Sequence, residues 1–102
     1  MSKSSTITDT DRPRPIHPGE ILREDFLPDF GLTPTSLARE LKIPRDRIEK
    51  IVRERRGITA DTAARLGRYF GTSAQFWMNL QAQYDLARLD PAEIQRVTPR
   101  AA

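Results

Sequence analysis

The chain has 102 residues and a mass of 11.7 kDa, the size of one ordinary domain, and 30 % of its residues are charged. The absence of cysteine excludes disulfide scaffolds, thiol catalysis and thiolate zinc sites. The single histidine, His17, leaves no paired imidazoles for a metal or for most acid–base schemes. No apolar run approaches the roughly 20 residues that span a bilayer, and the first residues lack a signal-peptide core. We therefore expect a cytoplasmic protein that is not an enzyme and that holds no cofactor or metal.

The net charge of +3 is distributed unevenly along the chain. Residues 33–57 contain 8 basic and 4 acidic residues, whereas residues 16–32 contain 1 and 4. A basic stretch that follows an acidic one and precedes a neutral one indicates a charged patch with an anionic partner.

Three segments differ in composition. Residues 1–15 are rich in Ser, Thr, Asp, Arg and Pro and contain Ile7 as their only branched aliphatic residue, so we expect a disordered tail. Residues 16–89 carry helical periodicity and are expected to form the domain. Residues 90–102 are weakly patterned and are expected to form a C-terminal tail.

The first helix is expected to begin at Pro18, since proline suits the first helical turn, and to be stopped by Pro28 and Gly31. Its apolar residues share one sector of a helical wheel: Ile21, Leu22 and Phe26.

The next two helices are short. Thr33 is a favourable N-cap for a helix that has Pro34 at its first position and that ends at Leu41. Pro44 interrupts this helix and opens a third one, which is expected from Arg45 to about Glu54. The apolar residues of the third helix share one face: Ile48, Ile51 and Val52.

Two longer helices follow. Thr59 caps a fourth helix that Gly71 closes, and Ser73 caps a fifth helix that runs to about Leu89. No strand-like alternation is present, so we expect an all-α fold with five helices. The fifth helix carries one core-facing stripe: Phe76, Trp77, Leu80, Tyr84 and Ala87.

The second and third helices, joined by a tight turn, predict a helix-turn-helix. In that motif the second helix enters a DNA major groove with its N-terminal end, which here begins with Arg45. The outer face and the turn behind it hold mostly cations: Asp46, Glu49, Lys50, Arg53, Arg55 and Arg56. The alternative is a solvated face, which the i, i+4 pairs Asp46–Lys50 and Glu49–Arg53 would support.

The chain resembles the HigA/VapI-like antitoxins of the XRE (lambda-repressor-like) helix-turn-helix class over residues 16–89. Three stretches carry the resemblance: Ile16-His17-Pro18-Gly19-Glu20 with Leu22; Leu37-Ala38 through Arg56-Gly57-Ile58-Thr59-Ala60; and Leu66-Gly67-Arg68-Tyr69-Phe70-Gly71-Thr72-Ser73 running into Phe76-Trp77-Met78-Asn79-Leu80-Gln81. The resemblance implies a five-helix all-α fold, a homodimer, a palindromic operator in double-stranded DNA, and direct neutralisation of a small basic ribonuclease toxin of the HigB/RelE type. A repressor of its own toxin–antitoxin operon would have these properties.

The resemblance also implies roles for single residues. The base-reading region of the family falls on Arg45, Asp46 and Lys50. The phosphate-contacting region falls on five residues: Pro34, Thr35, Arg53, Arg55 and Arg56. Together with Glu49 on the same helix face, these residues are the candidate DNA-binding set.

Two positions depart from the family's pattern. The turn between the two helices usually has glycine where Lys42 stands, which costs about 1 kcal/mol if the backbone there has a positive φ. The end of the recognition helix often carries Asn-Gly where this chain has Arg53-Glu54, so the helix could continue further and redirect Arg55 and Arg56.

A second apolar strip lies on another side of the fifth helix: Met78, Ala82, Leu86 and Leu89. A surface helix of a small domain needs only one buried face, so this strip is the candidate dimer interface. Ordinary exposure of scattered apolar residues is the alternative. The surface around Phe26 and Phe30 is the next candidate for the interface.

Two other functional classes remain open at the level of sequence. A stand-alone XRE-family regulator without a toxin partner would have the same helix-turn-helix, because toxin contacts have no local signature. A metal-dependent nuclease is disfavoured, since the chain has neither a D-x-D nor an H-x-E cluster. His17, just before the first helix, is expected to cap that helix or to pack against the domain.

Overall fold

A computed structural model describes residues 14–101 of the chain. Of the tail expected over residues 1–15, residues 1–13 lie outside the described residues. The helices, in chain order, are α1 (Pro18–Ile21), the π-helical segment η3 (Leu22–Phe26), α2 (Leu27–Asp29), α3 (Pro34–Leu41), α4 (Arg45–Val52), α5 (Ala60–Phe70), α6 (Ala74–Ala87) and α7 (Pro91–Gln95).

All regular structure within residues 14–101 is helical, which confirms the predicted all-α class and all five predicted helices. The first of them consists of α1, η3 and α2 in direct succession, and α3 to α6 are the other four. The third predicted helix, α4, ends at Val52 rather than at about Glu54. The short helix α7 was not predicted; it begins where the Asp90 carboxylate accepts a hydrogen bond of 3.0 Å from the Ala92 N–H.

The prediction that Pro28 stops the first helix is wrong. Pro28 lies inside α2, and the helical run ends at Asp29, two residues before Gly31. A proline normally breaks a helix because it lacks an N–H and its ring crowds the preceding turn. Here the turn before it is widened into η3, where the Leu27 N–H donates to the Leu22 carbonyl, so the chain remains helical through Pro28.

The core surrounds Trp77, the largest fully buried side chain. Its ring lies 4.9 Å from that of Phe26, and its indole N–H donates to the Thr72 hydroxyl at 2.9 Å. Of the stripe expected on the fifth helix, Trp77 is fully buried and Phe76 is 37 % exposed at the edge of the core. The other three residues of the stripe are half-buried: Leu80, Tyr84 and Ala87.

The predicted caps are confirmed at the starts of three helices. The hydroxyls of Thr33, Thr59 and Ser73 accept hydrogen bonds from backbone N–H groups one turn further on, at 3.1, 3.5 and 3.0 Å. His17 caps α1 as expected, since its Nδ1 accepts the Gly19 N–H at 2.8 Å. It also lies against the domain, with its ring edge-on to Tyr84 at a centroid distance of 4.8 Å.

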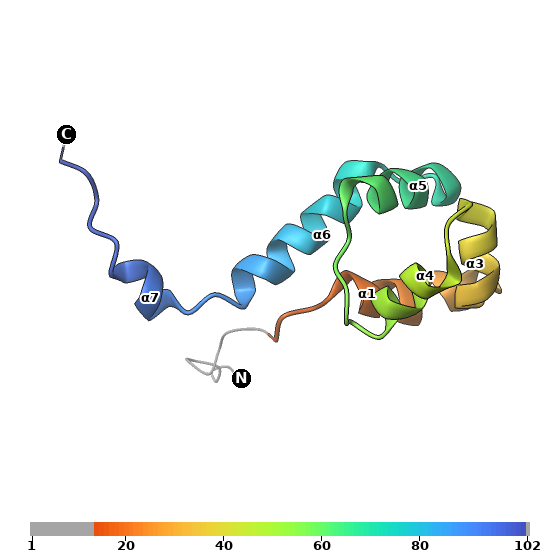
Figure 1. Ribbon diagram of the computed structural model, residues 1–102, viewed down its shortest axis with the longest axis horizontal. Helices are drawn as coiled ribbons and strands as arrows, with labels where there is room; N and C mark the ends of the chain where they lie inside the picture. The colour runs from red at the N-terminus through yellow and green to blue at the C-terminus, as the bar shows by residue number, and fades with distance from the viewer. Residues whose placement is uncertain (1–13, 102) are drawn as a thin grey trace, which may run out of the picture.

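The molecule is elongated and flat, with principal extents of 49 × 42 × 23 Å. In Figure 1, α1, α3, α4 and α5 gather at one end, while α6 runs away from them toward α7 and the C-terminus. No helix in the part of the chain that the structure describes is long and apolar enough to cross a membrane.

Candidate nucleic-acid interface

Helix α4 has one buried and one exposed face. Ile48 and Ile51 are fully buried and Val52 is 7 % exposed, as its apolar periodicity predicts. The opposite face carries the charged residues of the candidate set, all exposed apart from the half-buried Glu49. The charged face is therefore turned to solvent along the whole helix.

Two ion pairs lie along this exposed face. Lys50 Nζ lies 3.2 Å from the Asp46 carboxylate, as the i, i+4 spacing predicts. The predicted Glu49–Arg53 pair is not formed; instead Glu49 Oε2 lies 3.5 Å from Arg45 Nε, one turn toward the N-terminus. Exposed pairs of this kind contribute about 0.2–1 kcal/mol, so the side chains can exchange them for contacts to another molecule.

Each helix of the motif is followed by a non-glycine residue whose backbone adopts the left-handed conformation. Lys42 after α3 and Glu54 after α4 each have φ of 62°, so the condition under which Lys42 costs stability is met. Paired backbone bonds close both ends: the Ile43 N–H donates to the Ala38 carbonyl at 3.1 Å, and the Arg55 N–H donates to the Lys50 carbonyl at 2.8 Å. This is the Schellman arrangement, which ends α4 and does not let it continue into the loop.

The C-terminal end of α4 rests on the first helical run. A Cβ at Gly19 would lie 1.8 Å from the Ile51 carbonyl oxygen, so only glycine allows this approach. Arg23 donates to the Val52 carbonyl, and its guanidinium lies 3.2 Å from the Glu54 carboxylate. The sequence analysis did not single out Arg23, the one basic residue of the acidic segment 16–32.

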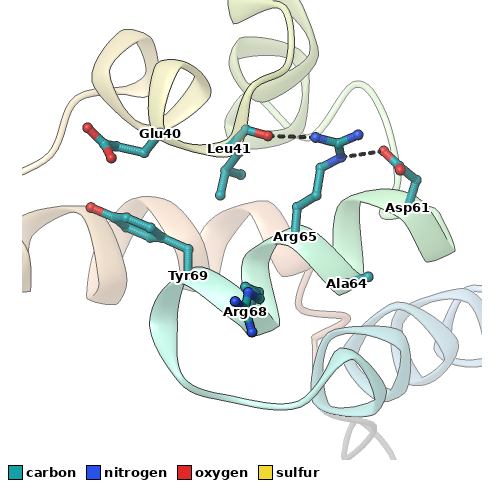
Figure 2. A pocket seen from close by; sticks show the side chains of 7 residues that line it. All are labelled: Glu40, Leu41, Asp61, Ala64, Arg65, Arg68 and Tyr69. Atoms are coloured by element: carbon teal, nitrogen blue, oxygen red, sulfur yellow. Dashed lines mark hydrogen bonds and ion pairs between the residues drawn. The ribbon is translucent and has the colours of Figure 1, made fainter.

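A second group of charged side chains joins α3, α4 and α5. Arg65 donates from α5 to the Leu41 carbonyl at 2.7 Å and contacts Asp61 at 3.0 Å (Figure 2). Asp61 also lies 2.7 Å from Arg47 on α4. Hydrogen bonds from Arg47 and Arg65 hold the pKa of the Asp61 carboxyl below its usual value. These residues, also missed by the sequence analysis, hold the two helices of the motif against α5.

The candidate DNA-binding residues follow one another across the motif. Pro34 and Thr35 form the first turn of α3, with Pro34 half-buried and Thr35 exposed. Arg53 caps the C-terminal end of α4, and Arg55 and Arg56 follow in the exposed loop. The set therefore extends from the start of α3 over the outer face of α4 to the loop behind it.

The apolar strip on α6 is only partly used by the core. Met78 is half-buried and packs against the core, whereas Ala82 is exposed. Leu86 is 67 % exposed on the last turn of α6. The helix ends at Ala87 rather than at about Leu89, so Leu89, which is 46 % exposed, lies just beyond it. Within residues 14–101, three of the four strip residues are thus open to solvent.

The paired helices, the tight turn and the exposed charged face define a helix-turn-helix protein. The chain is 55 % identical over 86 residues to virulence-associated protein I of Dichelobacter nodosus, covering 82 % of this chain and 80 % of the relative. It belongs to the HigA/VapI-like family of helix-turn-helix antitoxins.

Two further comparisons agree with this assignment. The structure of Pseudomonas aeruginosa antitoxin HigA with the higBA promoter matches with a TM-score of 0.76 and 59 % identity, over 81 % of this chain and 90 % of that chain. Antitoxin HigA-1 of Vibrio cholerae is 32 % identical over 72 % of this chain and 69 % of the relative. No family model matches the chain. Like these relatives, the chain is not an enzyme.

Proposed function

We propose that the chain is an antitoxin and a sequence-specific DNA-binding repressor of its own toxin–antitoxin operon, acting in the cytoplasm. The observation that carries this proposal is the exposed charged face of α4. This helix is set off from α3 by one Schellman turn and closed at its C-terminal end by another, and contacts with Arg23 and Asp61 brace it. The similarity to an antitoxin solved with promoter DNA supports it.

In this proposal α4 lies in the major groove with its N-terminal turn toward the base edges. Arg45 presents a forked donor suited to guanine, and Asp46 and Lys50 lie beside it on the same face. Glu49 lines that face as well. The phosphate contacts come from the start of α3 and from behind α4: Pro34, Thr35, Arg53, Arg55 and Arg56.

The proposed DNA-binding unit is a homodimer. One recognition helix contacts only a few base pairs, so useful specificity requires two half-sites about one helical turn apart, as in a palindromic operator. The strip of Met78, Ala82, Leu86 and Leu89 is the proposed interface, because it is apolar and its C-terminal part lies outside the core.

The DNA-binding part of the proposal is tested with the duplex that precedes the gene of this chain. Anisotropy titrations compare that duplex with a scrambled duplex of equal length and composition. A much tighter complex with the upstream duplex is expected, and equal affinity for the two would refute sequence-specific repression.

The antitoxin part of the proposal requires a small basic ribonuclease of the HigB/RelE type as partner. Co-expression of this chain with the product of the adjacent gene, followed by size-exclusion chromatography, tests it. Co-elution together with loss of ribonuclease activity is expected. If the chain binds its upstream DNA but neither co-elutes with nor inhibits the neighbouring product, it is the stand-alone XRE-family regulator instead.

A further inference from the structure

A polar pocket of about 200 Å³ lies between the loop after α4 and the C-terminal half of α6. Three arginines line it: Arg55 and Arg56 from the loop, and Arg88 from the C-terminal cap of α6. The loop and α6 are separate elements, so only the folded chain brings these three cations to one place.

None of these three arginines forms an ion pair with another residue that the structure describes. Among residues 14–101, no carboxylate lies within ion-pair distance of Arg55, Arg56 or Arg88. The two acidic residues that line the same pocket are held by other partners. Glu54 pairs with Arg23 at 3.2 Å, and Asp85 accepts a hydrogen bond of 2.9 Å from Gln81.

Both sides of the pocket are held in place. The loop is fixed where the Ile58 N–H donates to the Gln81 side chain of α6 at 2.6 Å. On α6, the Arg88 guanidinium lies over the Tyr84 ring, 5.0 Å from its centroid. Three guanidinium groups without ion-pair partners outnumber the two carboxylates that line the pocket. This arrangement matches the chemistry of a phosphoryl group, whose oxygens accept several hydrogen bonds at once.

We infer that this pocket binds a phosphoryl group and that Arg88 of α6, outside the helix-turn-helix, is one of its ligands. Within the proposed function the group is a phosphodiester of the DNA backbone beyond the recognition helix. Arg88 lies between Leu86 and Leu89 in the sequence, so this contact would join DNA binding to the helix that carries the proposed dimer interface.

The first arm of the test measures the salt dependence of DNA binding with Arg88→Gln, which removes the charge and keeps a polar side chain. The probe is a duplex enriched from a random library by the unaltered full-length chain. The slope of log K against log salt is expected to fall by about one unit for each protomer bound. The matched control is Arg68→Gln on α5, an exposed arginine in a different pocket, which should leave the slope unchanged (Figure 2).

The second arm uses no DNA. Inorganic phosphate is added to the full chain at constant ionic strength, with chloride as the control anion, while the arginine side-chain N–H signals are followed by NMR. A saturable phosphate shift that Arg88→Gln abolishes and Arg68→Gln retains supports the pocket with free phosphate as a source. A reduced salt slope in the first arm supports it with the DNA backbone as the source.

The inference is overturned if Arg88→Gln changes neither the salt slope nor the phosphate signals. Circular dichroism and sedimentation of both variants show whether each keeps the fold and assembly of the unaltered chain. A chain that enriches no duplex would refute the proposed repressor function, and the phosphate titration would still decide whether the pocket binds a phosphoryl group.

Discussion

Lys42 and Glu54 occupy left-handed backbone positions at the ends of the two helices that form the motif. This conformation costs a residue with a Cβ about 1–2 kcal/mol of free energy, whereas glycine adopts it freely. Lys42→Gly is therefore expected to raise the free energy of unfolding by about 1 kcal/mol, partly offset by the larger entropy of the unfolded chain. Urea denaturation measures the change.

Lys42→Ala is the control for this prediction, since it removes the exposed side chain and keeps the Cβ. Lys42→Ala should not raise the free energy of unfolding. Equal stabilities of the Gly and Ala variants would contradict the backbone explanation. Glu54→Gly should raise the free energy of unfolding by less than Lys42→Gly does, because it also removes the ion pair with Arg23.

His17 connects pH to stability. Burial lowers the pKa of this imidazole below its ordinary value, although Glu54, the Arg56 backbone and Asp85 oppose the shift. A group with a lowered folded-state pKa stabilises the fold above its unfolded pKa. The free energy of unfolding is therefore expected to decrease as the pH falls below about 6.5, because the unfolded chain then takes up the proton first. Thermal denaturation between pH 7.5 and 5 measures this.

His17→Asn is the matched variant for the pH prediction, since asparagine is also a good N-cap and does not titrate in this range. The decrease in stability between pH 6.5 and 5 should become smaller in this variant. An unchanged pH profile would assign the effect to other groups.

Arg45 and Arg53 lie at opposite ends of α4 and are expected to affect DNA binding differently. Arg45→Ala should cost about 1–3 kcal/mol on the enriched duplex and little on random DNA, if Arg45 reads a guanine. Arg53→Ala, or Arg56→Ala, should weaken binding to every sequence and flatten the salt dependence. Equal losses on both duplexes for Arg45→Ala would contradict base reading and leave a phosphate contact possible.

At the scale of elements, the contact between α1 and α4 depends on Gly19. Gly19→Ala would place a Cβ 1.8 Å from the Ile51 carbonyl oxygen, and rigid backbone on both sides must then move apart. A loss of at least about 1–3 kcal/mol in stability is expected, as for other overpacked contacts, with weaker DNA binding because α4 loses its support. Urea denaturation and DNA titration measure the two effects.

Gly57→Ala is the control for the prediction about the contact between α1 and α4. A Cβ there would meet the Gln81 side chain at 2.9 Å, and a flexible side chain moves more easily than a helix backbone. The loss in stability should therefore be smaller than for Gly19→Ala. The reverse order would show that the approach of α1 to α4 does not limit stability.

At the scale of the whole molecule, the proposed dimer predicts the effect of a charge on the α6 strip. Leu86→Asp would place two carboxylates at or near the two-fold axis and is expected to give folded monomers that bind the enriched duplex weakly. Sedimentation measures the assembly, and circular dichroism checks the fold. The control is Ile94→Asp on α7, outside the strip at a comparable exposure of 54 %, which should leave the dimer intact.

A Leu86→Asp protein that remains dimeric with unchanged helicity would exclude the strip as the interface. The surface around Phe26 and Phe30 would then be tested next. Phe30 is 54 % exposed there, with its ring 4.9 Å from that of Phe70.

Local sequence determined the helices and most of their ends. The hydroxyls of Thr33, Thr59 and Ser73 cap helices through bonds within one turn, and the apolar spacing of Ile48 and Ile51 alone identifies the buried face of α4. Such features depend on residues three or four positions apart, so they can be predicted without knowing what packs against them. The candidate DNA-binding face was found in this way.

Only the tertiary structure decided what supports that face. Arg23 reaches α4 across about thirty residues of sequence. Asp61 on α5 joins Arg47 of α4 to Arg65, which in turn donates to the Leu41 carbonyl at the end of α3. Arg88 faces Arg55 and Arg56 only because α6 packs beside the loop. The helix also continues through Pro28, where capping and breaker rules end it, because the turn before it widens into η3. Neither a helical period nor a capping rule connects positions as distant as those of the arginines, because the fold itself creates their contacts.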